Sequence, residues 1–522
     1  MPYIYTNMKK LPIGIQTFRD IIDEGFAYVD KTEIAYNLIT VGRYYFLSRP
    51  RRFGKSLFLD TLKEIFEGNK RLFKGLYIED KWDFENVHPV LRISLGAGGA
   101  KTKKELDRLL KWHLEDAEDN LKINCPKEAP ANECFKYLIK EAYEKTGKKV
   151  VILIDEYDKP ILDNITDTQT ALLMRDEMKS FYAVIKDSDT YIRLVFITGV
   201  SKFSKMNLFS GLNNLEDITL DANYATICGY RHKDLLTTFR EHLRGADMEE
   251  VRKWYNGYNY FGDKVYNPFD ILLFISKGKE FRNYWWSTGN PSFLIRLLNE
   301  KDFYLPDIEN YEATDEILDS FDIDTIELPA LLWQTGYLTI KEKIWERNRI
   351  KYKLTIPNLE IQFSLNEFFI DALTTQRTEK IRIQDRLYEA LEKGNLDALK
   401  EVLYGLFASI PYHNFTNNKI AEYEGYYASL IYAYFASLGL DTIPEDTYSK
   451  GRIDMTLKMN DNVFIFEFKV VDKATGNALQ QIKDKKYYEK YQPAKGTIYL
   501  IGIEFGRKER NILNYQWEAL LN

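Results

Sequence analysis

Residues 48–56 read Ser48-Arg-Pro-Arg-Arg-Phe-Gly-Lys-Ser56 and join two regular patterns. An apolar run typical of a buried strand, Tyr44–Leu47, precedes them, and a helical pattern, Leu57–Phe66, follows them. A strand, a loop that ends in Gly-Lys-Ser and a helix are the order of elements in a phosphate-binding loop. The stretch therefore predicts an α/β domain with a nucleotide site at this loop.

The last three residues of the loop have separate expected roles. Gly54 would let the backbone approach phosphate groups, and Lys55 would neutralise their β and γ charges. Ser56 would be a ligand of Mg²⁺. The start of the helix adds free N–H groups and a favourable dipole. This arrangement predicts ATP and Mg²⁺ as the cofactors.

The loop departs from the usual pattern G-x-x-x-x-G-K-[ST], because Arg49 stands where the first glycine is expected. Pro50 restricts one φ angle there. Arg51 and Arg52 supply cationic donors that could bind phosphate, although they would repel each other in its absence. On its own, Gly-Lys-Ser could also be the polar start of an ordinary helix.

A second motif strengthens the prediction of a nucleotide site. Val150–Glu156 is an apolar strand that ends in two acids, as a Walker B strand does. Asp155 is expected to bind Mg²⁺, and Glu156 to orient or deprotonate the attacking water. Thr198 ends another apolar strand and is expected to contact the γ-phosphate. Ser201 is an alternative for that role, and a simple Thr-Gly turn is another interpretation.

The surrounding pattern predicts a parallel sheet with helices on both faces. Short apolar runs alternate with long helical segments, such as 103–120 and 170–186. The predicted buried strands are Tyr44–Leu47, Val90–Leu95, Val150–Ile154 and Leu194–Thr198. The fold class is therefore α/β, with a P-loop core at residues 1–229.

Two further regions follow this core. Residues 230–410 are rich in helical patterns. Within them, 328–369 shows helix, hairpin and helix, which is compatible with a winged helix; the hairpin would pair Tyr337–Lys341 with Lys351–Ile356. A third region, 411–522, begins near His413 and combines strands and helices.

This third region contains a second group of catalytic residue types. Asp454 lies in one predicted strand, and Glu467 and Lys469 lie in the next, with a turn at residues 460–462 between them. Side chains alternate along a strand, so Glu467 and Lys469 share one face, and the hairpin can bring Asp454 beside them. Two carboxylates and a lysine are what metal-dependent phosphodiester hydrolysis needs, with Asp454 and Glu467 as Mg²⁺ ligands.

Neighbouring residues fit this interpretation. Glu424 starts an uncharged helix and could add a further acid, and Gln480 or Gln481 could contact the site from a basic helix. Residues 450–490 carry nine Lys or Arg against six Asp or Glu, which favours DNA as a partner. The alternative interpretation is an edge hairpin with an ordinary alternation of Glu and Lys on its surface.

Composition excludes some classes of protein. The chain has 522 residues, 45% of them hydrophobic and 15% aromatic, so it is not a disordered chain. Its formal charge of −6 argues against a wholly basic nucleic-acid-binding surface. Three cysteines without a C-x-x-C pair favour free thiols of a reducing compartment over a disulfide framework. Residues 425–440 are too few for a membrane helix, and no signal peptide is visible, so we expect a cytoplasmic protein without membrane contact.

Several strings resemble one known family. They are LPIGIQTFRD, YVDKT, FLSRPRRFGKSL, FKGLYIE, LIDEYDKPI, FITGVSKFSK, LFSGLNNLEDITL, WYNGY and NPFDIL, and they cover most of residues 10–290. They resemble the AAA-ATPase-like proteins of bacteria and archaea that carry a C-terminal PD-(D/E)XK nuclease-like domain. The resemblance implies an AAA-like core and accounts for Arg49, because R-P-R-R-F-G-K-S is the family's own form of the loop. The group Asp454, Glu467 and Lys469 is similar to the nuclease motif, with Ile453 in place of its proline.

The resulting functional hypothesis is a protein that binds and hydrolyses ATP and carries a Mg²⁺-dependent DNA endonuclease-like domain. Defence against foreign DNA and processing of mobile elements are the roles that the resemblance implies. The alternative is a nucleotide-dependent switch or scaffold whose C-terminal region binds nucleic acid or protein without cutting. Self-association into a homo-oligomer stays open.

Overall fold

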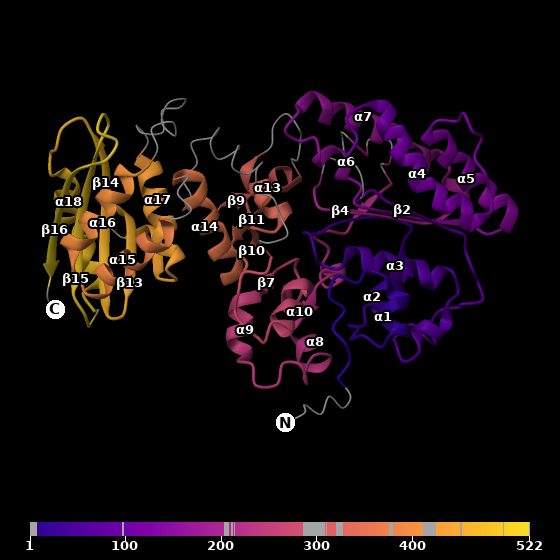
Figure 1. Cartoon of the computed structure of the whole chain (residues 1–522), viewed down its shortest axis with the longest axis horizontal. Helices are drawn as coiled ribbons and strands as arrows, with labels where there is room; N and C mark the ends of the chain where they lie inside the picture. The colour runs from indigo at the N-terminus through magenta and orange to yellow at the C-terminus, as the bar shows by residue number, and fades with distance from the viewer. Residues whose placement is uncertain are drawn as a thin grey trace. The chain divides into compact units, whose positions relative to one another are not determined.

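The structure is a computed structural model of the chain, and Figure 1 shows it from the N-terminus to the C-terminus. The residues that it describes are 8–96, 99–202, 208–209, 212, 214–285, 308, 311–319, 327–374, 379–410, 424–448, 451–493 and 495–520. The chain divides into two compact units. The first unit is Met1–Gly289 with Glu312–Asn358, and the second unit is Asn290–Tyr311 with Leu359–Asn522.

A parallel sheet of five strands forms the centre of the first unit, in the order β2-β3-β4-β1-β5. Its strands are β1 (Tyr44–Ser48), β2 (Val90–Ser94), β3 (Val150–Asp155), β4 (Ile192–Gly199) and β5 (Glu216–Asp217). The four strands predicted from apolar runs are confirmed. Every residue of β1 and β3 is buried, as expected for parallel strands that are covered on both faces.

Helices cover this sheet on both sides. They are α1 (Phe18–Asp23), α2 (Thr32–Val41), α3 (Lys55–Phe66), α4 (Lys103–Leu121), α5 (Ala131–Thr146), α6 (Lys159–Leu162) and α7 (Thr168–Asp187). Figure 1 shows α1–α3 on one side of the sheet and α4–α7 on the other. The buried residues of α4 recur every three or four positions, at Leu106, Leu110, Leu114 and Ala117, which is the spacing of a helix with one apolar face.

The rest of the first unit consists of short helices and two small sheets. After the central sheet come β6 (Tyr230–Arg231), α8 (His232–Thr237), α9 (Met248–Tyr255), β7 (Asn256–Tyr258), β8 (Val265–Tyr266) and α10 (Pro268–Ser276). Then follow β9 (Glu312–Ala313), α12 (Asp315–Asp319), α13 (Leu328–Thr335), β10 (Thr339–Glu346) and β11 (Arg349–Thr355). The predicted hairpin is confirmed as β10 and β11, and it extends further toward its tip than expected.

The second unit contains a mixed sheet in the order β12-β13-β14-β15-β16, in which only β14 and β15 are parallel to each other. Its elements are α14 (Leu359–Thr374), α15 (Lys380–Glu392), α16 (Leu396–Ala408), α17 (Glu424–Ser437), β12 (Asp441–Tyr448), β13 (Gly451–Met459), β14 (Asn462–Val471), α18 (Asn477–Lys485), β15 (Ile498–Gly506) and β16 (Ile512–Leu520). The predicted turn after β13 is confirmed. Residues 425–436 of α17 are all buried, because this helix is apolar all round and needs a covered position.

The boundary between the two units, at Asn358 and Leu359, falls inside the middle region predicted at 230–410. The second helix of the predicted helix-hairpin-helix pattern, α14, therefore belongs to the second unit. Residue His413, where the third region is predicted to begin, lies outside the described residues. The division into three domains stays a prediction.

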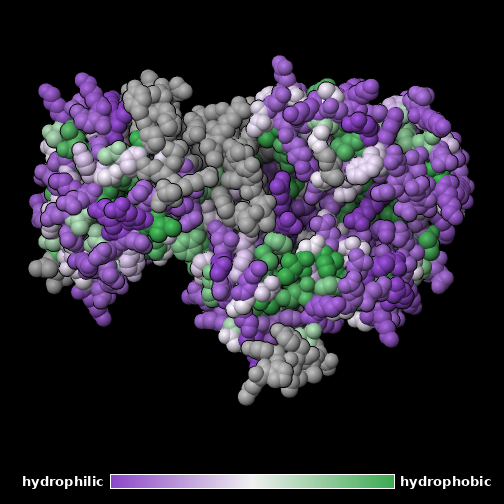
Figure 2. Space-filling model, viewed as in Figure 1, coloured by the Kyte–Doolittle hydropathy of each residue, from purple (hydrophilic) through white to green (hydrophobic). Residues whose placement is uncertain are grey.

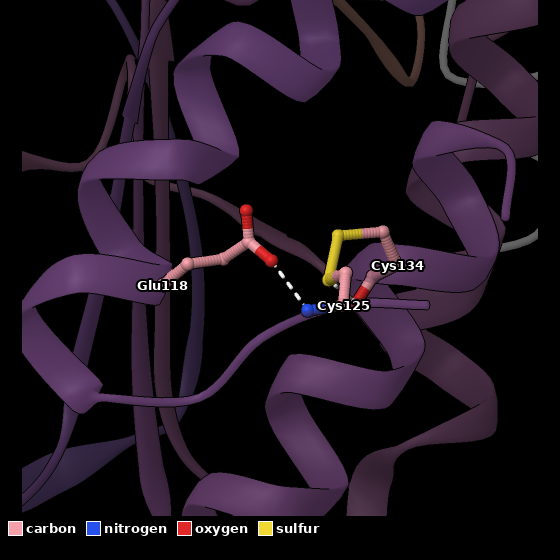
Figure 3. A group of neighbouring side chains, drawn as sticks. All are labelled: Glu118, Cys125 and Cys134. Atoms are coloured by element: carbon pink, nitrogen blue, oxygen red, sulfur yellow. Dashed lines mark hydrogen bonds between the residues drawn. A yellow bond between two sulfur atoms is a disulfide. The ribbon is translucent and has the colours of Figure 1, made fainter. Parts of the chain in front are cut away.

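One expectation about the cysteines is wrong. Cys125 and Cys134 form a disulfide, with their Cα atoms 5.4 Å apart, while Cys228 is free and buried. Figure 3 shows the pair beside Glu118, whose carboxylate accepts a hydrogen bond from the backbone N–H of Cys125. The chain turns back between α4 and α5, so two cysteines that are nine positions apart meet. Such a spacing matches no motif, and only the packing of the two helices reveals it.

Candidate nucleotide and nuclease sites

The loop between β1 and α3 is built around the buried side chain of Arg49. This side chain is 1% exposed, and its guanidinium lies 3.6 Å from the centre of the Tyr260 ring. It donates hydrogen bonds to the carbonyl oxygens of Ser48 (2.9 Å) and Thr219 (2.8 Å). The residue that replaces the usual glycine therefore points into the protein core, where it joins the loop to the segment after β5.

Lys55 starts α3 and is held by the loop itself. Its ammonium group donates to the carbonyl oxygens of Arg49 and Pro50, both at 2.9 Å. Burial lowers the pKa of Lys55, and the negative charge of Asp155 opposes that shift. Gly54 before it has φ +95°, in the left-handed region, and a Cβ there would meet no atom within 4 Å. Glycine is therefore favoured at position 54 by the backbone angle and not by crowding.

A cavity of about 380 Å³ lies at this loop. Its polar residues include Arg51, Arg52, Gly54, Lys55 and Ser56 from the loop and Glu156, Asp158 and Lys159 from the end of β3 and the start of α6. Its apolar residues include Pro12, Ile15, Pro268, Phe269 and Leu272. Figure 2 shows hydrophobic residues gathered over the region of α10, the helix that supplies the last three. A cavity that combines cationic loop residues with apolar residues suits a nucleotide.

The structure places two predicted residues differently from the others. Thr198 is fully buried, and its hydroxyl donates to the carbonyl oxygen of Leu47 at 2.8 Å, so it does not line the cavity. Asp155 is 2% exposed and accepts a hydrogen bond from the N–H of Glu156 at 3.0 Å. Ser201 is also engaged, because its hydroxyl donates to Asp158.

Asp158 and Gly96 also contribute to this site; the sequence offers Asp158 only as an alternative to Glu156 for positioning the water, and it gives Gly96 no role. Asp158 accepts hydrogen bonds from the N–H groups of Val200 (3.1 Å) and Ser201 (2.6 Å), which joins the ends of β3 and β4. A Cβ at Gly96 would lie 2.7 Å from a carboxylate oxygen of Glu156, so the glycine leaves room for that carboxylate. The only signal for Gly96 in the sequence is that a glycine directly follows the predicted strand Val90–Leu95.

The acids of this site repel one another. Burial raises the pKa of Glu156, and the charges of Asp155 and Asp158 raise it further, while Lys55 lowers it. Burial also raises the pKa of Asp158, against the hydrogen bonds from Ser201. A set of hard oxygen donors with excess negative charge fits Mg²⁺. Ser56, Asp155 and Glu156 are the residues that could hold it.

In the second unit, β13, β14 and α18 bring the predicted nuclease residues together. Glu467 is fully buried, and its Oε1 accepts hydrogen bonds from the ammonium of Lys469, at 3.1 Å, and from the amide of Gln481. Asp454 accepts a hydrogen bond from the N–H of Phe468 at 2.8 Å. Of the two glutamines considered in α18, Gln481 thus contacts the site, whereas Gln480 donates to Asp484.

The charges of this group are strongly coupled. Burial raises the pKa of Glu467 to about 8, Asp454 adds to the shift, and Lys469 opposes it. Burial likewise raises the pKa of Asp454 and of Glu424, and the charge of Lys469 lowers both. Among the described residues, the second carboxylate oxygen of Glu467, Oε2, is buried without a hydrogen-bond partner. The carboxyl groups of Asp454 and Glu467, with an unsatisfied oxygen beside the ammonium of Lys469, offer hard oxygen ligands to a divalent metal ion.

The position of α18 depends on two residues of β15. Glu504 is 1% exposed and accepts hydrogen bonds from the N–H groups of Thr475 and Asn477, both at 2.8 Å, at the start of the helix. The hydroxyl of Thr475 donates to it at 2.6 Å, and the amide of Asn514 at 3.1 Å. Gly502 leaves room for the helix backbone. The sequence gives no signal for Glu504. For Gly502 the only signal is that a glycine stands inside the final expected strand, residues 496–503.

Comparison with known proteins agrees with the interpretation of both sites, the one at the loop before α3 and the one at β13 and β14. Residues 12–209 match the family model of a predicted AAA-ATPase, and residues 422–515 match the PD-(D/E)XK nuclease superfamily. The chain is also 47% identical, over 514 residues, to an uncharacterized protein in the vnfD 5′ region of Azotobacter chroococcum mcd 1, and the match covers 98% of this chain and 99% of that protein.

The chain belongs to this AAA-ATPase-like family with a C-terminal PD-(D/E)XK domain. The two matches fall on different compact units, the first on the parallel sheet and its helices and the second on the mixed sheet. Family membership and the observed sheets confirm the predicted fold class. Within the described residues, no helix combines the length and the apolar character that crossing a membrane requires.

Proposed function

We propose that the first unit binds ATP with Mg²⁺ and hydrolyses it, and that its nucleotide state controls Mg²⁺-dependent cleavage of DNA by the second unit in the cytoplasm. The observation that carries this proposal is the environment of Glu467. A buried carboxylate oxygen without a hydrogen-bond partner is costly unless something binds it. Asp454 and Lys469 beside it complete the group that phosphodiester hydrolysis requires.

In the first unit, the cationic side chains would bind the phosphates and the oxygen-bearing side chains would bind the metal ion. Lys55 would neutralise the β- and γ-phosphates, and Arg51 and Arg52 add donors from the same loop. Ser56 and Asp155 would hold Mg²⁺, which supplies further positive charge when bound. Thr198 stays a predicted contact of the γ-phosphate, which would require its hydroxyl to leave the carbonyl oxygen of Leu47. Arg51, Arg52, Lys55 and Ser56 line one cavity, which supports the assignment of these four residues.

Glu156 is the group in the first unit that can accept a proton from water. Its raised pKa makes its carboxylate a stronger base than an exposed glutamate. The room left by Gly96 supports a carboxylate that is aimed into the cavity. These features favour hydrolysis of ATP over binding alone.

In the second unit, Asp454 and Glu467 would hold the metal ion, which polarises the phosphodiester when bound. Lys469 would position water or neutralise charge that develops on the phosphate. Glu424 is a further candidate acid. Gln481 is a positioning residue, because its amide fixes the orientation of the Glu467 carboxylate.

Cleavage of supercoiled plasmid DNA tests the proposal. The wild-type protein with Mg²⁺ and ATP should convert the plasmid to nicked or linear forms, and Asp454→Asn should not. Asp461→Asn is a matched control, because Asp461 is an exposed acid in the turn between β13 and β14. The Lys55→Ala protein keeps the residues of the nuclease site but should not bind ATP. Addition of ATP should therefore no longer change its rate of cleavage.

Absence of cleavage by the wild-type protein under every nucleotide and metal condition, with ATP binding intact, would overturn the nuclease half of the proposal. The protein would then be the nucleotide-dependent switch or scaffold. Equal cleavage by wild-type and Asp454→Asn proteins would show that a contaminating nuclease or another site is responsible.

A further inference from the structure

Strands β10 and β11 of the first unit form a hairpin (Figure 1), and we call residues 339–355 the basic hairpin. Its strands pair from Thr339 with Thr355 up to Glu346 with Arg349. The two turn residues, Arg347 and Asn348, have φ of 48° and 62°. Two successive left-handed residues are the geometry of a type I′ turn, which fits the twist of a tight hairpin.

The base of the basic hairpin is anchored in the first unit. Ile340 and Leu354 are fully buried, and the hydroxyl of Tyr352 donates to Asp315 at 2.7 Å. The backbone N–H of Asn259 donates to Thr339 at 2.8 Å, and its side-chain amide donates to the carbonyl oxygen of Ile340 at 2.9 Å. The tip, in contrast, is exposed from Glu346 to Arg349. A fixed base below an exposed tip is suited to holding a ligand at a defined position.

The charge of the basic hairpin is opposite to that of the whole chain. Residues 341–353 carry six Lys or Arg and two Glu, a net charge of +4, in a chain with a formal charge of −6. Both glutamates are paired within the hairpin, Glu346 with Lys351 at 2.8 Å and Glu342 with Lys353 at 3.9 Å. Four cations remain that have no carboxylate partner among the described residues: Lys341, Lys343, Arg347 and Arg349. Such an excess of positive charge favours a polyanion.

Trp345 stands among these cations. Its side chain is 69% exposed, more than that of the other exposed tryptophans of the described residues, Trp112 at 54% and Trp517 at 39%. It pairs across the hairpin with Ile350 and lies two positions before Arg347. Lys343 and Tyr352 share the face of Trp345 and Ile350, whereas Arg349 pairs with Glu346 on the other face, and Arg347 lies in the turn. An exposed indole with Lys343 on its own face and Arg347 in the adjoining turn offers a stacking surface for a base together with donors for its phosphates.

We propose that the basic hairpin binds single-stranded DNA, with Trp345 stacked on an unpaired base and Lys343 and Arg347 on the backbone. Stacking needs a base that is free of its neighbour, so the hairpin should prefer single strands to a closed duplex. The choice of DNA rests on the proposed function, because a nuclease-family unit in the same chain supplies the reason for a DNA ligand. The contact itself belongs to the ATPase unit and is separate from Asp454, Glu467 and Lys469.

Binding of fluorescein-labelled dT30 and of a 30-base-pair duplex to the full-length protein, measured in EDTA by anisotropy, tests this proposal without cleavage. The wild-type protein should bind dT30 more tightly than the duplex. Trp345→Ala should weaken binding of dT30 by about 5-fold or more, the lower end of the effect of losing one stacked base. Lys343→Gln with Arg347→Gln should reduce the slope of log K against log salt by about 1.4 for two phosphate contacts on a single strand.

Two matched controls separate this contact from general effects. Trp112→Ala removes another exposed tryptophan, on α4, and should leave the affinity for dT30 unchanged. Lys136→Gln with Lys140→Gln removes two exposed cations of α5, with side chains 57% and 52% exposed, and should leave the salt slope unchanged. Equal affinity of wild-type and Trp345→Ala proteins for dT30 would overturn the proposal, as would equal losses in the controls.

A membrane surface is the other ligand that a basic tip with a tryptophan could fit. Vesicles of phosphatidylcholine and phosphatidylglycerol in equal amounts should not bind the protein in a sedimentation assay. Binding that Trp345→Ala abolishes, without any effect on dT30, would assign the hairpin to a membrane instead. The outcome is independent of cleavage: an inactive nuclease site with intact hairpin binding would refute the proposed function and leave this inference standing.

Discussion

The backbone nitrogen of Leu479 lies 2.2 Å from the position that a Cβ atom of Gly502 would take. Helix α18 therefore rests directly on strand β15, without a side chain between them. This contact sets the distance between the sheet and Gln481, whose amide binds the buried carboxylate of Glu467. The geometry of the nuclease site thus depends on a residue that contributes no functional group.

Gly502→Ala should displace α18 and destabilise the second unit by ~1–3 kcal/mol, the usual cost of overpacking a tight contact. Metal-dependent cleavage should fall as well, since Gln481 moves with the helix. Urea unfolding and plasmid cleavage measure the two effects. The control is Gly405→Ala in α16, where a Cβ would meet nothing within 4 Å; it should be neutral or stabilising. A fully stable Gly502→Ala protein would contradict the close contact.

Glu504 should make the stability of the second unit depend on pH. Burial alone would raise the pKa of Glu504, but the hydrogen bonds from Thr475, Gly476 and Asn514 outweigh it and lower the pKa to about 2, from 4.5. A lowered folded-state pKa gives stability that is fully present above pH ~4.5 and is lost as the pH falls toward ~2. Glu504→Gln should therefore cost ~3 kcal/mol at pH 7, at ~1.4 kcal/mol for each pKa unit, and progressively less in acid.

Denaturant unfolding of both proteins between pH 7 and pH 3 measures this difference. Glu518→Gln is the control, because Glu518 pairs with Lys483 on the surface, with both side chains 43% exposed. An exposed pair of this kind contributes little, so the control should follow the wild-type curve. A Glu504→Gln protein whose deficit is the same at all pH values would show that the carboxylate charge is not involved.

Lys55→Ala should abolish ATP binding at millimolar nucleotide while the fold persists. The ammonium group of Lys55 is buried at the cavity, and burial lowers its pKa. Calorimetric titration with ATP and Mg²⁺ checks binding, and circular dichroism checks the fold. Lys63→Ala, on the same helix but outside the cavity, should bind ATP normally. Unchanged affinity of Lys55→Ala would remove the phosphate-binding loop assignment.

Glu156→Gln and Asp155→Asn should separate hydrolysis from binding. Glu156 is proposed to act on water only as the bond to the γ-phosphate breaks, so Glu156→Gln should bind ATP normally and hydrolyse it at least ~10²-fold more slowly. Asp155→Asn should instead weaken the binding of ATP that depends on Mg²⁺. Steady-state turnover and calorimetry on both proteins decide this. Wild-type turnover by Glu156→Gln would make Asp158, which lines the same cavity, the next candidate base.

Much of the architecture could be predicted because it depends on short-range patterns. Apolar runs located the four longest strands of the parallel sheet. Strands β1 and β3 are buried at every residue, as expected of strands covered on both faces, whereas the edge strand β2 is buried at alternate residues. The turn between β13 and β14, the proximity of Glu467 and Lys469 and the grouping of Gly54, Lys55 and Ser56 follow from the chain's own periodicity and from residue order. These features depend on few residues at a time, so the sequence by itself determined them.

Tertiary packing decided the features that join distant segments. Arg49 is buried against Tyr260, the hydroxyl of Thr198 donates to Leu47, and Cys125 pairs with Cys134. Glu504 binds the start of α18 from another strand. Each of these side chains could occupy a buried or an exposed position. Its actual position is set by a contact with a residue that is distant in sequence or belongs to no motif. The free energy of such a contact depends on burial and on hydrogen-bond partners, which only the folded arrangement of the elements supplies.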